Sequence, residues 1–223
     1  MTGTNVYWPL FDLVVKTPRL QLRYATDDLL LELCDVAGDV LGEGPRPFDG
    51  NATFYDRTVT GRRRWLAGQW SARARCSPSW WVLVFAVVVD GHAVGTQEIT
   101  GVDFPLVRTI DSFSWLTRAA QGEGIGKEMR AAALHLAFDG LGAERANSDA
   151  FEDNARSLGV SRALAYEPNG TLLAAREGEV APMSRLLLTR EAWLARRRTD
   201  LVIEGLEPAK AFLGLGGGVS GQS

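Results

Sequence analysis

The amino-acid sequence predicts a mixed α/β (α+β) fold with a mostly antiparallel central sheet flanked by helices. Two segments rich in β-branched and aromatic residues, 80–89 and 92–100, meet across the turn Asp90-Gly91, a pattern typical of a β-hairpin. A glycine-rich loop at 122–126 then opens a segment with helical spacing, and further strand-like segments follow it. Because strands both precede and follow the helices, the fold class is mixed.

The first half of the chain is expected to begin with one strand and two helices. Residues 20–24 alternate as in a strand, and the side-chain oxygens at the start of segment 26–36 can cap an apolar helix. Segment 42–51 is rich in glycine and proline and predicts a loop, after which helical spacing returns over 54–70. Ser77-Pro78-Ser79 ends this second helix. The hairpin then begins an antiparallel meander.

The meander continues, after a loop at 103–105, with a strand at 107–116, and the glycine loop and its helix follow, ending near Gly140. The remaining expected elements are a strand at 146–151, a helix at 154–163, strands at 171–176 and 183–189, and a helix at 191–198. Residues 201–203 can add an edge strand. We therefore expect a single domain over residues 1–205 and a flexible, glycine-rich C-terminal tail over 206–223.

Composition excludes several classes of function. The 223 residues are 46% hydrophobic, enough for the core of one domain, and the net charge of -3 lacks the basic excess that nucleic-acid binding needs. Two cysteines far apart, with no ligand-like spacing to the two histidines, predict neither a metal site nor a disulfide framework. The longest apolar run, 80–89, is half of the about 20 residues that span a bilayer, and an export signal is lacking at the start. We expect a cytoplasmic protein that binds neither membrane nor nucleic acid.

The glycine loop is the motif that carries chemistry. Backbone amides at the start of a helix can all point at one anion, and the helix dipole adds partial positive charge there, which suits a pyrophosphate. The order Gly122-Glu123-Gly124-Ile125-Gly126 places the third glycine one residue early for a dinucleotide fingerprint. A Walker loop is excluded because Glu128 follows Lys127 where a magnesium-binding Ser or Thr belongs.

Gln121, Gly124 and Gly126 fit the acyl-CoA signature R/Q-x-x-G-x-G/A, and the segment resembles the GNAT superfamily of N-acetyltransferases. Segment 112–126 is similar to the corresponding segment of the ribosomal-protein alanine acetyltransferase branch. The N-x-x-S motif of that branch is matched by Asn154-Ala155-Arg156-Ser157. Two positions depart from the pattern, since Ala165 and Phe113 stand where relatives often have glycine. Blocks 103–105 and 111–116 look most like an actinobacterial group associated with succinyl-CoA.

The resemblance implies a GNAT fold with splayed strands at the acyl-CoA site and a cosubstrate that is acetyl-CoA or succinyl-CoA, without a metal. It implies that backbone near the end of the third meander strand pairs with the pantetheine arm, that the loop holds the pyrophosphate and that the next helix contributes two more residues. The cofactor-binding residues so implied are Ser114, Leu116, Gln121, Gly122, Glu123, Gly124, Ile125, Gly126, Lys127, Asn154 and Ser157.

Three side chains are candidates for catalysis. An amine must lose a proton to attack a thioester, so a carboxylate facing the acceptor is expected, and Asp111 and Glu98 are the candidates. Both could equally be solvated or salt-bridged strand residues. By analogy with the family, Ser157 donates a proton to the leaving thiolate, and a backbone amide at Leu116 or a neighbour binds the oxyanion. Asn154 could instead serve only as a helix N-cap.

The expected activity is transfer of an acetyl or succinyl group from CoA to a primary amine in a ternary complex. The acceptor could be a protein or peptide N-terminus, a lysine or a small molecule. Two alternatives stay open: a non-catalytic acyl-CoA-binding module and an antibiotic-modifying acetyltransferase. Trp65 and Trp70 could line the acceptor pocket or belong to the core. A homodimer formed through the late strands is expected by analogy.

Overall fold

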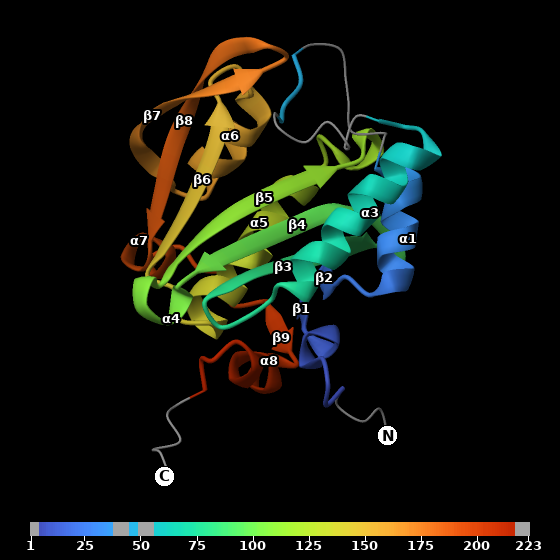
Figure 1. Ribbon diagram of the computed structural model, residues 1–223. Helices are drawn as coiled ribbons and strands as arrows, with labels where there is room; N and C mark the ends of the chain where they lie inside the picture. The colour runs from blue at the N-terminus through green and yellow to red at the C-terminus, as the bar shows by residue number, and fades with distance from the viewer. Residues whose placement is uncertain (1–4, 38–44, 49–55, 217–223) are drawn as a thin grey trace.

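The computed structural model describes residues 5–37, 45–48 and 56–216, and a nine-stranded sheet lies at its centre (Figure 1). The strands run in the order β7-β8-β6-β5-β4-β3-β2-β1-β9. Their bounds are β1 Val14–Lys16, β2 Gln21–Tyr24, β3 Trp80–Val89, β4 His92–Val102, β5 Thr109–Leu116, β6 Arg145–Phe151, β7 Glu167–Arg176, β8 Glu179–Thr189 and β9 Val202–Glu204. The mixed, mostly antiparallel sheet predicted from the sequence is confirmed.

The pairing between β5 and β6 is parallel, whereas every other pair of neighbouring strands in this sheet is antiparallel. It is also short, because only residues 109–111 of β5 pair with residues 145–147 of β6. Beyond that point β6 and the β7–β8 hairpin diverge from β5, and Figure 1 shows the resulting opening in the sheet. This opening positions the candidate site.

Helices cover both faces of the sheet (Figure 1). The helices α1 (Asp27–Val36) and α3 (Val59–Ala74) pack on one face, over a core cluster that includes Leu33, Trp65 and Trp115. On the other face lie α5 (Ile125–His135) and α6 (Ala155–Ala163), over the larger cluster. The shorter helical segments are η1 Pro9–Asp12, α4 Phe104–Val107, η2 Arg118–Ala120, the π-helical turn η3 Leu136–Gly140, α7 Arg190–Leu194 and α8 Leu206–Phe212.

Local signals in the sequence produce several of these boundaries. The Thr26 hydroxyl caps α1 by accepting the Leu29 amide at 3.4 Å. Asp90 and Gly91 both have positive φ, 51° and 86°, as a two-residue hairpin turn requires. The edge strand expected near 201–203 forms as β9, paired with β1. Most of the expected loop 42–51 and the expected helix start near Phe54 lie outside the described residues.

The C-terminal segment differs from the prediction. Residues 206–212 were expected to belong to a flexible tail, but they form the helix α8, in which Ala209 is fully buried, and Leu213 directly after it is fully buried too. The chain turns into α8 at Gly205, whose φ of 71° favours glycine, and a Cβ there would lie 2.3 Å from the Asp12 carbonyl oxygen. The prediction failed because the glycine-rich composition beyond residue 213 was extended to the residues before it, which form a short helix that packs on the N-terminal segment. Strand β1, at Val14–Lys16, precedes the first strand that the sequence predicts, at 20–24.

Candidate active site

The opening in the sheet gives β5 two chemically different faces. Ser112 and Ser114 share the face of Leu116, which packs with α5, whereas Asp111 and Phe113 share the face of Trp115, which packs with α1 and α3. Past Asp111, no strand of the described chain pairs with the edge of β5 that faces β6. This edge is therefore free to pair with an extended ligand.

The glycine loop lies directly after β5 and leads into α5. Gly122 and Gly124 have φ values of 89° and 79°, in the left-handed region that favours glycine. Gly124 is the N-cap of α5 and supplies no side-chain cap, and the first amide bonded within the helix is that of Glu128, which donates to the Gly124 carbonyl at 3.1 Å. The amides of residues 122–127 form no hydrogen bond with any described residue. Unpaired amides therefore stand at the start of α5, where the sequence predicts a pyrophosphate site.

The Gln121 side chain braces this loop. Its amide nitrogen donates to the Leu116 carbonyl at 2.8 Å, and its oxygen accepts from Arg156 of α6 at 2.6 Å. Gln121 thereby joins the end of β5, the loop and the start of α6. Glu123 and Lys127 are exposed on the loop and first turn, while Ile125 is buried beneath them.

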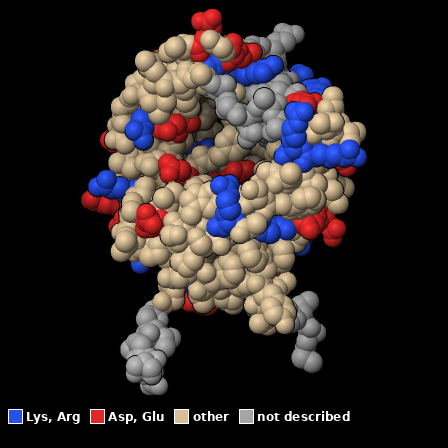
Figure 2. Space-filling view, in the orientation of Figure 1, with Lys and Arg blue, Asp and Glu red and all other residues tan. Residues whose placement is uncertain are grey.

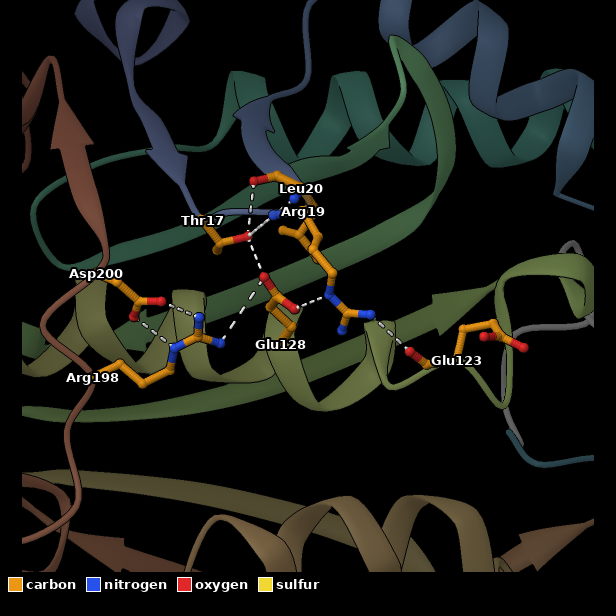
Figure 3. A network of polar contacts seen from close by, with 7 residues as sticks. All are labelled: Thr17, Arg19, Leu20, Glu123, Glu128, Arg198 and Asp200. Carbon is orange, nitrogen blue, oxygen red and sulfur yellow. Dashed lines mark hydrogen bonds and ion pairs between the residues drawn. The ribbon is translucent and has the colours of Figure 1, made fainter.

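A buried carboxylate holds the first turn of α5 in place (Figure 3). Glu128 accepts from the Thr17 hydroxyl and from Arg19 Nε, both at 2.6 Å, and Arg198 approaches it at 4.0 Å. Burial raises the pKa of Glu128, but these hydrogen bonds and charges outweigh it and lower the pKa below its ordinary value. Arg19 also donates to the Glu123 carbonyl at 3.0 Å, so the turn between β1 and β2 supports the loop.

Asn154 and Ser157 come together at the start of α6. The Asn154 Oδ1 accepts the Ser157 amide at 3.1 Å, as expected of an N-cap, and both residues are half-buried. Capping uses only the oxygen of Asn154, so its amide group is still available to a ligand. Ala165, one of the two departures from the family pattern, has a φ of 64° after α6, so it keeps the backbone conformation that glycine favours.

The two carboxylates predicted for proton removal lie on one face of the sheet. Glu98 on β4 pairs with Phe113 of β5, which places its side chain on the side of α1 and α3. It is half-buried, and burial raises its pKa to about 7. Asp111 is exposed and accepts from Asn147 of β6 at 3.2 Å. A pKa of about 7 suits Glu98 to act as a base near neutral pH.

Sequence reasoning missed a third carboxylate on this face. Asp149 lies on β6 two residues beyond Asn147, and burial raises its pKa, opposed by Arg185 at 3.7 Å and assisted by the charge of Asp111. Figure 2 shows that this face is hollowed between the β6–β8 strands and α3, and that acidic side chains gather there. The alternation of residues 146–151 predicts which face Asp149 takes, but only the pairing of β6 with β5 brings it near Asp111.

The two tryptophans of α3 differ in burial. Trp65 is 4% exposed in the core, as one of the two expectations had it, whereas Trp70 is 46% exposed and donates to Asp27 at 3.2 Å. Phe113, the other departure from the family pattern, packs on Phe48 with ring centroids 4.8 Å apart. The Phe113 ring therefore occupies space on the α1 and α3 side of β5 that a glycine would leave open.

The fold and site together define a class of protein: a mixed sheet that opens between two parallel strands, with unpaired amides at a helix start beside the opening, is the architecture of acyl-CoA-dependent acetyltransferases. Residues 19–167 match the acetyltransferase (GNAT) domain, and the chain belongs to that family. It is thus a transferase of the GNAT N-acetyltransferase class, for which acetyl-CoA is the typical cosubstrate. Within the described ranges no helix is both long and apolar enough to cross a bilayer.

Solved structures share this fold. RimL, a ribosomal L7/L12 α-N-protein acetyltransferase in complex with coenzyme A, superposes with a TM-score of 0.67 at 17% identity, over 80% of this chain and 99% of that one. RimJ of Mycobacterium smegmatis, in complex with CoA-disulfide, gives 0.66 at 19% identity, over 84% and 95%. A GCN5-related N-acetyltransferase from Brucella melitensis gives 0.64 at 17% identity, over 82% and 80%.

Proposed function

We propose that this protein transfers an acetyl group from acetyl-CoA to a primary amine by direct attack in a ternary complex. One observation carries the proposal. On the α5 side of the opening between β5 and β6 lie the unpaired loop amides, and on the opposite side of the sheet lies the half-buried Glu98, with a pKa of about 7. Cosubstrate and amine can thus approach the opening from opposite faces of the sheet.

The cosubstrate binds along β5 and the loop. The amides of residues 122–127 hold the pyrophosphate, and the pantetheine arm pairs with the free edge of β5 near Ser114 and Leu116. Asn154 contributes its free side-chain amide to the arm, and Ser157 lies beside it on the same turn of α6. The braced position of Gln121 supports this site because it fixes the loop relative to the strand without occupying the loop amides.

The acceptor enters the acidic hollow. Asp111 and Asp149 give it a negative potential that favours a protonated amine, and Glu98 then removes the proton. The amine nitrogen attacks the thioester carbonyl, a backbone amide near Leu116 binds the oxyanion, and the carbon–sulfur bond breaks. The fold shared with RimL supports a protein N-terminus as the first acceptor to screen, ahead of lysines and small amines. Succinyl-CoA is the alternative acyl donor.

We also propose that the protein forms a homodimer through its late strands. Strand β7 is an edge of the sheet with mostly exposed side chains, and the β7–β8 hairpin exposes Leu173 by 72% and Val180 by 73%. Exposed apolar side chains on an edge strand are typical of strand-to-strand association.

Calorimetric titration with acetyl-CoA, succinyl-CoA and free CoA tests the cosubstrate site. In Gly126→Glu, the new Cβ would meet Leu116 and Val160 at 3.8 Å, an ordinary contact, while the carboxylate would repel a pyrophosphate. We expect affinity for all three ligands to fall about 100-fold or more, equivalent to about 2.7 kcal/mol. The control Gly68→Glu, on the exposed surface of α3, should bind as the wild type does. Wild-type affinity in Gly126→Glu would contradict the assignment.

A further inference from the structure

Arg130 of α5 is a buried cation whose charge no described residue neutralises. It is 5% exposed, and its guanidinium donates to the Ser148 and Ser114 hydroxyls, each at 3.1 Å. Its Nε has no hydrogen-bond partner, and no carboxylate of the described chain forms an ion pair with it. Its partners supply dipoles but no negative charge.

Such an arrangement is unfavourable in the protein alone. Burying a charge without a counterion costs several kcal/mol, and replacement by an apolar side chain is often neutral or stabilising. Tyr166 interacts with Arg130 but does not neutralise it. Burial raises the pKa of Tyr166, with the charge and hydrogen bonding of Arg130 acting against it, so this phenol is neutral near pH 7. Asp111, which also interacts with Tyr166, lies on the opposite face of β5. The cation therefore fits a negative charge that arrives with a ligand.

The position of Arg130 indicates which charge this is. Ser114 lies on β5 and Ser148 on β6, just past the last paired residues Asp111 and Asn147. The guanidinium thus bridges the two strands where they separate, on the face of the sheet that carries the glycine loop. Under the proposed function, the pantetheine arm runs from the loop along β5 toward this point, and its sulfur ends there.

We propose that Arg130 is a catalytic residue that binds the sulfur of coenzyme A and stabilises the thiolate that leaves during acyl transfer. In that step the bond between the amine nitrogen and the acyl carbon forms, and the carbon–sulfur bond breaks. The electron pair of the broken bond goes to sulfur, and the amine proton goes to the base. A thiolate held by a fixed cation needs no proton at the moment of cleavage, so Ser157 need only donate a hydrogen bond. This assignment rests on the proposed function.

Titration of the bound thiol tests the role of Arg130 separately from folding. Arg130→Met removes the charge but keeps an apolar side chain of similar length, Arg130→Lys keeps the charge, and Arg162→Met removes an exposed arginine of α6 as the matched control. In the wild type, the pKa of the thiol of bound CoA, followed by thiolate ultraviolet absorbance, should lie below that of free CoA titrated in the same buffer. It should be at least about one unit higher in Arg130→Met, and intermediate in Arg130→Lys.

Binding and turnover complete the test. Desulfo-CoA should bind wild type and Arg130→Met equally, whereas kcat with acetyl-CoA should fall about 100-fold in Arg130→Met at nearly constant KM. Equal thiol pKa values in these two proteins would overturn the proposal. Selective loss of succinyl-CoA binding, with acetyl-CoA kinetics intact, would also overturn it and assign Arg130 to an acyl carboxylate. Failure of the wild type to bind any CoA would instead refute the proposed function.

Discussion

At the scale of single residues, the environment of Glu98 determines what its carboxyl group can do. The Glu98 carboxyl group has no hydrogen-bond partner or ion pair among the described residues, so burial alone raises its pKa to about 7. Glu128, which is more deeply buried, receives two close donors and has a lowered pKa. Two glutamates on opposite faces of the sheet thus differ in pKa, because hydrogen bonds and an ion pair stabilise the charged form of Glu128, whereas no described residue does so for Glu98.

Substitution of Glu98 by glutamine should separate catalysis from stability. Without the base, kcat/KM should fall about 100-fold or more, and the rise of kcat/KM through about pH 7 expected of the wild type should disappear. Steady-state rates between pH 5.5 and 9 measure both effects, with Asp111→Asn as the comparison. A wild-type pH profile in Glu98→Gln would remove Glu98 from the mechanism.

The same variant should be more stable than the wild type at alkaline pH. The folded-state pKa of about 7 lies above the ordinary 4.5, so the folded state favours the protonated carboxyl. The contribution of Glu98 to the free energy of unfolding should therefore be greatest below about pH 4.5 and fall as pH rises toward 7. Glutamine does not ionise, so at pH 8 Glu98→Gln should gain up to about 3 kcal/mol, measured by urea denaturation.

At the scale of elements, the junction between β9 and α8 packs on the N-terminal segment of the chain. Gly205 makes the turn with a φ of 71°, and the Asp12 carbonyl lies against its Cα. Helix η1 packs against both α8 and β2, and α8 contributes the fully buried Ala209. The packing of the last described helix, α8, against the first, η1, thus depends on the restricted backbone conformation of Gly205.

Gly205→Ala should therefore be more destabilising than an alanine in another left-handed turn. The added Cβ would lie 2.3 Å from the Asp12 oxygen, in addition to the left-handed strain of about 1–2 kcal/mol. The control Gly178→Ala, in the β7–β8 turn with a φ of 89°, meets no atom within 4 Å and should show the strain alone. Urea denaturation should give a loss for Gly205→Ala larger by about 2 kcal/mol. Equal losses of stability in the two variants would mean that the backbone at Asp12 shifts to accommodate the Cβ with no loss of free energy.

The elements differ in how far the sequence predicts them. Short-range signals suffice for the hairpin at Asp90, the cap at Thr26 and the glycine loop, because each depends on backbone preferences within a few residues. Long-range pairing has no such signal. Neither the contact of β6 with β5 that brings Asp149 to the hollow, nor the burial of Arg130 between two serines, can be derived from spacing along the chain.

At the scale of the whole molecule, the sheet has two edges of different character. Strand β9 is a three-residue edge beside α8, whereas β7 is ten residues long and its hairpin carries exposed apolar side chains. Native proteins usually protect long edges, and association is one way to do so. The proposed homodimer would cover β7 and leave the opening between β5 and β6 accessible.

Light scattering coupled to size-exclusion chromatography should give twice the chain mass of 24.3 kDa for the wild type. Leu173→Lys places a charge on the exposed hairpin and should shift the protein to the monomer mass at the same concentration. The control Leu106→Lys alters a side chain that is 87% exposed on α4, away from this edge, and should leave the mass unchanged. A monomeric wild type, or an equal effect of both variants, would contradict dimerisation through β7.

The three-residue parallel ladder between β5 and β6 also bears on how the molecule folds and fluctuates. Strands β2 through β5 and strands β6 through β8 form two antiparallel groups, while β5 and β6 meet only after the loop and α5 intervene. Contacts close in sequence form early, and pairings that require a long crossover form late. The ladder beside the candidate site should therefore be among the last parts to assemble and the first to exchange its amide hydrogens. We therefore expect β5 and β6 to separate locally while both strand groups stay folded.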